Sequence, residues 1–308
     1  MTDRSDSKVA HRFGGVWTEI KLKALADYLQ FYQGALRGQK FETWYVDAFA
    51  GTGDRHAFVE TGGMFENKPL TIEERVLEGS ARKALRIEPP FAHFWFAERN
   101  KRRATALGSL RNEFLGRDII VRRGEANAEL EHLFTSRPWV GSDAWKQRAV
   151  VFLDPYGMSV DWTTLKLLAE TKRADVWYLF PRAAVVRQLA HDLTAVDADK
   201  RRRLSQVFGG DDWEEEFYRA RPAQTSLLFD SPAEGSGGRV ATSEQIAVFA
   251  RKKFGTLFGF VSDPLPLTVK SQDQFELYCL SNNPPAFSLI KKGVDFVLKK
   301  YGRASRRA

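Results

Sequence analysis

The sequence predicts an α/β protein with a mostly parallel sheet covered by helices on both faces. Apolar, strand-like runs alternate with helical segments of roughly 10–15 residues between about residues 91 and 181. The strand-like run at 41–49 is aromatic and β-branched, as is typical of a strand that is buried on both faces. The chain has 308 residues, a length that fits one large domain with insertions or two domains.

The first elements follow from local spacing. Residues 1–12 are mostly polar, and we expect them to be disordered. Apolar residues then recur at helical spacing, which predicts a helix that starts after Thr18 as N-cap and runs to about Arg37. An aromatic, β-branched strand at 41–49 follows, and it ends in the small-residue turn at 50–53.

Residues 54–77 interrupt the pattern. They contain two adjacent glycines and a proline and lack clear periodicity, so we expect an inserted loop that can act as a lid. The alternation beyond it predicts a helix at 79–87, a strand at 91–98, a helix at 101–114, a strand at 118–123, a helix at 128–134, a strand at 149–154, a helix at 162–171 and a strand at 175–181. Right-handed connections between such units give a parallel sheet.

Regularity fails after residue 181, where we expect a helical insertion that is closed by a flexible loop rich in Gly, Ser and Pro. The expected elements there are a helix at 184–193, a flexible stretch at 231–239, a helix at 244–254, two strands near 258–269 and 274–280, and a last helix at 286–301. The predicted organisation is a disordered segment 1–12 and a single domain 13–308, with helical insertions at about 54–77 and 182–256.

Composition narrows the class of protein. The 47 Lys and Arg against 39 Asp and Glu give a formal charge of +8, which fits either a nucleic-acid partner or an ordinary solvated surface. Cys279 is the single cysteine and the five histidines are scattered, so we expect neither a disulfide nor a metal site. No apolar stretch is long enough to cross a membrane and no secretory signal is evident, so we expect a cytoplasmic protein without membrane contact.

Residues just after the strands are the candidates for ligand binding, because ligands of open α/β sheets bind beyond the carboxyl ends of the strands. Asp47 ends the first strand and can bind an ammonium group, while Gly51 and Gly53 leave room for a ligand near the backbone. Glu98 ends the second strand and can accept both hydroxyls of a ribose. Glu125 follows the third strand and can accept from an adenine amine.

Each of these residues also has an ordinary structural interpretation. The two glycines fit a plain tight turn, and Glu125 fits the start of a helix for which Asn127 is the N-cap. The 51 positions from Asp47 to Glu98 exceed the usual spacing of ~20 in dinucleotide folds. Glu98 is therefore placed correctly only if 54–77 is an insertion.

Asp154, Pro155 and Tyr156 follow the fourth strand. The ordinary interpretation is a rigid turn, since Pro fixes φ and Asp favours turns. The functional interpretation uses that rigidity: Asp154 and the Pro155 carbonyl accept the hydrogens of a planar amine, and Tyr156 stacks on its ring.

The D-x-F-x-G-x-G run at 47–53, the acidic end of the second strand and the D-P-Y run at 154–156 resemble class I S-adenosylmethionine (SAM) dependent methyltransferases, particularly those that methylate an exocyclic amine. A more specific resemblance, over about residues 14–300, is to the three-Cys-motif partner protein family (TcmP). It rests on the runs Trp17–Leu22, Tyr45–Gly53, Asp154–Trp162 and Asp175–Pro181.

The resemblance implies a Rossmann-like class I methyltransferase sheet of seven mostly parallel strands, the last antiparallel. It also implies SAM as cofactor and a partner with a three-cysteine motif that resembles a radical-SAM-type phage protein. The implied SAM-binding residues are Asp47, Phe49, Gly51, Gly53, Glu98 and Glu125. Most amino-methyltransferases have D-P-P-Y where this chain has D-P-Y-G, and similar D-P-F-G runs occur in tRNA guanosine N2-methyltransferases.

Two functions follow as expectations. One is methylation of an exocyclic amine of a nucleic acid through Asp154, Pro155 and Tyr156, and the alternative is a non-catalytic partner or scaffold for the three-Cys protein. The basic run 200–203 and the basic tail at 291–308 fit either nucleic-acid contact or a solvated surface. Trp139, Trp145 and Trp213 fit partner contacts or, more commonly for tryptophan, buried packing.

Overall fold

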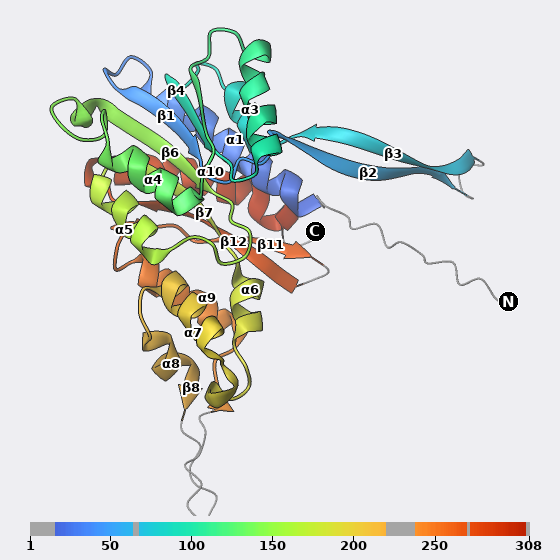
Figure 1. The fold of residues 1–308 in the computed structure, drawn as a ribbon, viewed down its shortest axis with the longest axis vertical. Coiled ribbons are helices and arrows are strands. Elements are labelled where there is room, and N and C mark those ends of the chain that lie inside the picture. Colours follow the sequence, from blue (N-terminus) through green and yellow to red (C-terminus); the bar gives the residue numbers. More distant parts are fainter. Residues whose placement is uncertain (1–15, 64–67, 220–237, 270–271, 306–308) are drawn as a thin grey trace, which may run out of the picture.

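The computed structural model describes residues 16–63, 68–219, 238–269 and 272–305 (Figure 1). Within these residues, eight strands form a central sheet in the order β10-β12-β7-β6-β1-β4-β5, with β11 paired to β12. The sheet consists of β1 (Glu42–Asp47), β4 (His93–Ala97), β5 (Ile119–Arg122), β6 (Gln147–Leu153), β7 (Ala174–Phe180), β10 (Phe260–Val261), β11 (Leu265–Val269) and β12 (Gln272–Ser281). Strands β5, β4, β1, β6 and β7 are parallel, and β12 is antiparallel to β7.

The expected α/β architecture with a mostly parallel sheet is confirmed, but the described sheet has eight strands where we expected seven. The stretch 258–269 forms two short strands, β10 and β11, that pair with different parts of β12. Pro264 lies between them and has no backbone N–H for a sheet hydrogen bond, which favours a break at this point.

Helices cover the two faces of the sheet unequally. Side chains such as Tyr45 and Trp177 belong to the core beneath α1, α2, α3 and α10, whereas Trp44 and Tyr178 belong to the core beneath α4 to α9. The helices are α1 (Val16–Leu36), α2 (Ser80–Leu85), α3 (Lys101–Glu113), α4 (Ala126–Thr135), α5 (Trp162–Thr171), α6 (Arg182–Gln188), α7 (Ala198–Phe208), α8 (Asp212–Phe217), α9 (Ser243–Phe254) and α10 (Phe287–Ser305). Successive residues of a strand point to opposite faces, which explains the alternation.

The insertion at 54–77 is neither a loop nor helical. It forms an antiparallel hairpin, β2 (Asp54–Gly63) with β3 (Lys68–Glu78), that extends away from the sheet (Figure 1). The backbone N–H of Gly79 donates to the Gly53 carbonyl at 2.8 Å, so the chain leaves and returns at one place. The two strands pair with each other and not with the central sheet. Their sequences therefore lack the hydrophobic periodicity that burial of one face against the core imposes.

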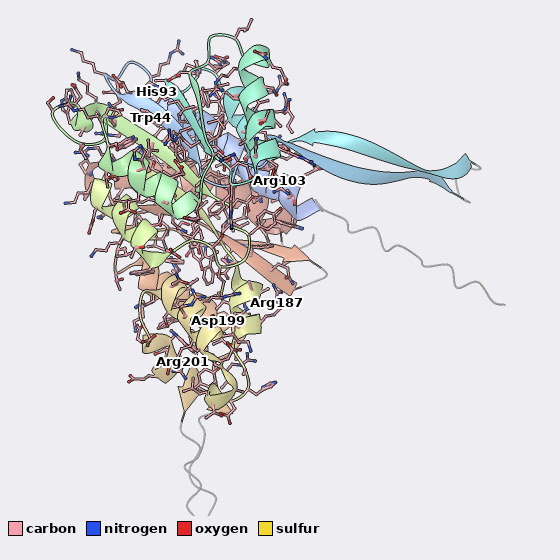
Figure 2. All side chains as sticks on the ribbon, viewed as in Figure 1. Trp44, His93, Arg103, Arg187, Asp199 and Arg201 are labelled. Atoms are coloured by element: carbon pink, nitrogen blue, oxygen red, sulfur yellow. The ribbon has the colours of Figure 1, made fainter. Side chains whose placement is uncertain are left out.

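The insertion at 182–256 is helical, as expected, and holds α6, α7, α8 and α9. The first helix ends at Gln188, earlier than the expected 193, and two short strands, β8 (Tyr218–Arg219) and β9 (Gly238–Arg239), form an extra pair. Most of the expected flexible stretch 231–239, and the expected disordered segment 1–12, lie outside the described residues. Asp199 and Arg201 of α7 lie in this insertion, well away from Trp44 and His93 (Figure 2).

Two predicted caps are wrong. Thr18 lies inside α1, which begins at Val16. The N-cap of α4 is Glu125 and not Asn127, because the helix begins at Ala126, two residues earlier than expected. Of the three tryptophans considered as partner contacts or core residues, Trp139 and Trp213 are buried and Trp145 is 54% exposed.

Candidate functional site

The carboxyl ends of the parallel strands meet at one edge of the sheet, which we call the carboxyl edge: Asp47, Ala97, Arg122, Leu153 and Phe180. The strand that follows β1 in the parallel part, β4, lies on one side of β1, and β6 lies on the other. The chain order therefore reverses between β1 and β6, at the ends marked by Asp47 and Asp154. Crevices at such reversals are where open α/β sheets bind ligands.

Asp47 is fully buried at the end of β1. Its Oδ2 accepts from Ser80 Oγ at 2.6 Å and from the Tyr45 hydroxyl at 3.3 Å, and its Oδ1 accepts from the backbone N–H of Phe49 at 3.1 Å. Burial raises the pKa of Asp47 to about 6, although these hydrogen bonds favour the charged form. The Asp154 charge also raises this pKa. Asp154 follows β6, which pairs with β1 so that Asp47 lies beside Phe152.

Asp154 forms an ion pair with Lys21 of α1. Lys21 is buried, with only 4% of its side chain exposed, against 28% for Asp154. The Lys21 ammonium also lies 5.2 Å from the ring centre of Trp17 and 5.9 Å from that of Phe152. A buried ammonium between aromatic faces and a carboxylate is a fixed charge that orients the carboxylate.

Sequence reasoning did not assign Lys21 and Ser80 to this site. Lys21 lies four residues before Leu25, on the apolar stripe of α1, and a lysine in such a stripe requires a buried carboxylate partner. The position of Lys21 in the sequence could therefore have indicated a buried ion pair. The sequence around Ser80 gives no such indication, because only the return of the chain from the β2–β3 hairpin places its hydroxyl beside Asp47.

The turn after β1 contains two glycines with different functions. Gly51 has φ +64°, and a Cβ there would meet no atom within 4 Å, so the backbone faces open space. Gly53 has φ +80°, and its Cβ would lie 3.0 Å from Leu110 Cδ1 of α3. Gly53 therefore allows close packing on α3, and Gly51 leaves the space that a ligand needs. Phe49, also predicted to bind cofactor, is half-buried against the core beneath α4 to α9.

Glu98 and Glu125 lie at the next two strand ends, as predicted. The Glu98 Oε1 accepts from the backbone N–H of Asn100 at 2.7 Å. The Glu125 side chain accepts from the backbone N–H of Ala128 at 3.0 Å and from Asn127 Nδ2 at 2.9 Å. Glu125 thus caps α4, which agrees with its ordinary interpretation. Each carboxylate has lone pairs left for a further donor.

Pro155 is buried beneath the turn, and Tyr156 is 73% exposed. The turn is held from α4, since Asn127 Nδ2 donates to the Ser159 carbonyl at 2.9 Å and its Oδ1 accepts from the backbone N–H of Asp161 at 3.0 Å. Burial and the Glu125 charge raise the pKa of Asp161. The structure therefore presents the Tyr156 ring to solvent on an anchored turn, next to Asp154.

The basic segments are partly neutralised where the structure describes them. In the run 200–203, Lys200 pairs with Asp197, Arg201 with Glu214 and Arg202 with Asp199. In the tail, Lys291 pairs with Asp295 at 2.7 Å and Lys300 with Asp27 at 2.6 Å. Nucleic-acid binding by these segments stays a prediction.

Neither a protein-family model nor a curated protein matches the chain. Among solved structures, it is similar to the crystal structure of protein LPL1258 from Legionella pneumophila str. Philadelphia 1, of family DUF519. The identity is 13%, the match covers 95% of each chain, and the TM-score is 0.49. At these values the likeness carries no conclusion about function.

Two absences concern only the residues that the structure describes. None of their helices combines the length and the apolar character needed to cross a bilayer. No group of three or more His, Cys, Asp or Glu side chains among them is arranged to hold a metal ion.

Proposed function

We propose that this chain is a class I methyltransferase-like protein that binds SAM at the carboxyl edge of its sheet. The reaction we propose is methyl transfer to an exocyclic amine of a nucleic acid, together with a three-Cys-motif partner. One observation carries the proposal: Asp47 and Asp154 lie at the carboxyl ends of the adjacent parallel strands β1 and β6, on either side of the chain reversal. The open space beside Gly51 lies in the turn that follows Asp47.

The strand order supports the fold part of the proposal. Five parallel strands with β1 in the middle, followed by an antiparallel β12 next to β7, agree with the sheet that the resemblance to class I methyltransferases implies. The hairpin at Asp54–Glu78 accounts for the long spacing between Asp47 and Glu98. This removes the main objection to placing Glu98 at the second strand end.

The residues at this edge fit SAM chemically. When bound, SAM supplies a sulfonium methyl group, whose carbon forms a bond to nitrogen as its bond to sulfur breaks. Asp47 holds negative charge for the ammonium end, Glu98 accepts the ribose hydroxyls, and Glu125 accepts from the adenine amine while it caps α4.

Asp154 positions the acceptor amine. Its Oδ2 is held by Lys21, so Oδ1 and the Pro155 carbonyl are left to accept the two amine hydrogens. The nitrogen lone pair then points away from both acceptors, and Tyr156 stacks on the attached ring. After transfer the amine gives up one proton to Asp154 or to water.

Calorimetric titration with SAM and with its demethylated product tests the cofactor part. We expect micromolar binding that weakens at least tenfold in Glu98→Ala and is unchanged in Glu131→Ala, which removes an exposed carboxylate from the α4 surface. Absence of binding by the wild-type protein, with and without the partner, would make the cofactor assignment wrong.

Methyl transfer is tested with radiolabelled SAM and pools of RNA and DNA. Asp154→Asn combined with Lys21→Met removes both charges of the pair at nearly constant volume, so we expect a folded protein that binds SAM and transfers no label. The single variant Lys21→Met keeps Asp154 and should retain measurable transfer. Full activity of the double variant would contradict the role of Asp154.

A second candidate is the non-catalytic partner of a three-Cys protein. It is favoured by the Lys21–Asp154 ion pair, which occupies one oxygen of the carboxylate that an acceptor amine needs. This candidate predicts that the partner co-purifies equally with wild-type protein and with Glu98→Ala, and that neither transfers a methyl group. Loss of co-purification in Glu98→Ala would count against it.

A further inference from the structure

A pocket of about 240 Å³ lies at the opposite edge of the sheet, where β6 and β7 begin. It is enclosed by α1, by residues at the start of these two strands and by the start of α10. The functional side chains that line it are Tyr28, Tyr32, Phe41, Arg148, Arg173 and Asp175. Asp175 lies five residues before the end of β7 at Phe180, which puts it roughly 17 Å from the carboxyl edge. The pocket is therefore separate from the candidate SAM site.

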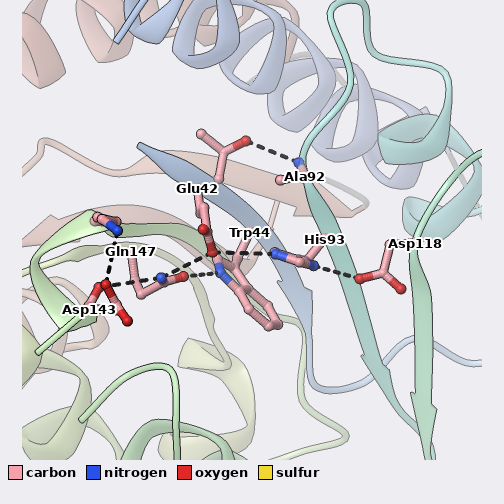
Figure 3. A network of polar contacts seen from close by, with 9 residues as sticks. Glu42, Trp44, Ala92, His93, Asp118, Asp143 and Gln147 are labelled. Atoms are coloured by element: carbon pink, nitrogen blue, oxygen red, sulfur yellow. Dashed lines mark hydrogen bonds and ion pairs between the residues drawn. The ribbon is translucent and has the colours of Figure 1, made fainter. Parts of the chain in front are cut away.

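We call this edge of the sheet, where the parallel strands begin, the amino edge. Outside the pocket, its side chains form a network of polar contacts (Figure 3). Gln147 Oε1 accepts from Trp44 Nε1 at 2.7 Å, and the rings of Trp44 and His93 lie 4.1 Å apart. His93 Nδ1 lies 2.5 Å from an oxygen of Asp118. These groups satisfy one another at β1, β4, β5 and β6, and none of them lines the pocket at β6 and β7.

Aromatic rings form the wall of the pocket. Tyr28 and Tyr32 lie 6.3 Å apart at an angle of 38°, one turn from each other on α1. Phe41 lies under the Arg148 guanidinium, with 4.0 Å between the guanidinium carbon and the ring centre. Leu289 and Ile290 add apolar surface from α10. This lining suits a flat apolar body.

The charge of the pocket is positive. Arg148 and Arg173 are close enough that Arg173 contributes to lowering the pKa of Arg148, after burial as the main cause. Neither guanidinium has a carboxylate within ion-pair distance among the described residues; Arg148 donates instead to the carbonyls of Trp145 and Gln147, both at 2.8 Å. The acid in the lining is Asp175, whose Oδ2 accepts from the Tyr28 hydroxyl at 2.8 Å.

Asp175 compensates at most half of that charge. Burial raises its pKa to about 6, so at neutral pH it holds one negative charge against two guanidinium charges, and below pH 6 it is largely neutral. Two positive charges in a half-buried aromatic pocket favour an anion. A phosphate dianion would be repelled by Asp175, whereas a carboxylate brings the single charge that the pocket lacks.

We infer that the amino-edge pocket is a binding site for a small aromatic carboxylate, whose ring lies against Tyr32 and Phe41 and whose carboxylate pairs with Arg173 and Arg148. The volume lies below the roughly 300–1,000 Å³ of drug-sized sites, which limits the ligand to about one ring and its side chain.

The test uses 3-phenylpropionate as probe and its amide, 3-phenylpropanamide, as a neutral match of the same size. We expect the acid to bind at least tenfold more tightly than the amide in calorimetry, because a charge-assisted pair with a guanidinium adds that much. Arg173→Gln should weaken the acid about tenfold and leave the amide unchanged. Arg203→Gln, which removes an exposed arginine of α7, should change neither.

Several results would overturn the inference. These are equal affinity for acid and amide, no binding of the acid at millimolar concentration, and an effect of Arg203→Gln as large as that of Arg173→Gln. Tighter binding of inorganic phosphate than of the acid, lost in Arg173→Gln, would also overturn it by identifying a phosphate site. Because Glu98→Ala is expected to bind the probe normally, failure of the SAM proposal and failure of this one are distinguishable.

Discussion

The two edges of the sheet each hold a buried aspartate on the face beneath α1. Asp47 lies at the carboxyl edge and Asp175 at the amino edge, and burial raises the pKa of each to about 6. Helix α1 reaches both regions: Lys21 pairs with Asp154 beside Asp47, and Tyr28, two turns later, donates to Asp175. Seven residues of helix span about 10 Å, so one helix links the two sites.

The edges differ in what surrounds these carboxyls. At the carboxyl edge the nearby cation, Lys21, is already paired with a carboxylate, and the turn after β1 uses glycines with positive φ. At the amino edge two arginines and one acid line the same pocket without forming an ion pair among the described residues, and the residue with positive φ is Lys172, at 55°. Equal burial of two acids therefore gives different chemistry, because the neighbours decide whether a site favours a cation or an anion.

The largest expected effect breaks the charge pair at the carboxyl edge. Lys21→Met should lower the free energy of unfolding by about 2 to 3 kcal/mol, because Asp154 keeps a charge without its partner. Urea denaturation measures this change. Arg173→Gln at the amino edge is the matched control and should change stability by less than about 0.5 kcal/mol. Equal losses in the two variants would mean that the edges do not differ in this way.

The second largest effect concerns the residues with positive φ at the two edges. Gly53→Ala should cost about 2 kcal/mol, because φ +80° is unfavourable for alanine and the new Cβ meets Leu110. Gly51→Ala has the same backbone penalty without the contact, so it should cost about 1 kcal/mol. Lys172→Gly should be neutral or slightly stabilising. Thermal unfolding compares the three, and a larger loss at Gly51 than at Gly53 would contradict the packing argument.

Asp47 and Asp175 should contribute equally to the pH dependence of the free energy of unfolding. Their folded pKa of about 6 lies above the unfolded value, so the folded protein takes up protons first and becomes more stable as pH falls from 8 to 5. The gain by pH 5 is about 1.4 kcal/mol for each group. Asp47→Asn and Asp175→Asn should each remove about that share of the pH dependence in urea titrations. Stability that falls between pH 8 and 5 would contradict the sign.

The smallest effect distinguishes capping from cofactor binding at Glu125. Glu125→Ala should cost about 1 kcal/mol, because the backbone N–H of Ala128 loses its acceptor. Glu125→Ser restores a cap and should restore stability, yet it cannot reach an adenine amine, so SAM affinity should stay weakened in both variants. If Glu125→Ser binds SAM like wild type, Glu125 is a cap and nothing more.

Local patterns predicted much of the fold. Helix α5 has the predicted bounds, Trp162–Thr171, and β4, β6 and β7 lie within two residues of their predicted ends. These elements bury one or both faces against the core, so burial imposes periodicity on their sequences. The hairpin at Asp54–Glu78 was missed because it pairs with itself, away from the core.

The sequence by itself determined the α/β class, the alternation of strands and helices between residues 91 and 181, the glycines of the turn after β1, and which carboxylates end the strands. Each of these depends on spacing within about 20 residues, which a linear pattern records. Only the tertiary structure paired Lys21 with Asp154 across 133 positions, brought Ser80 to Asp47 across 33, and gathered Arg148, Arg173 and Asp175 with Tyr28 around one pocket. Packing between distant segments decides such contacts, and no local periodicity encodes them.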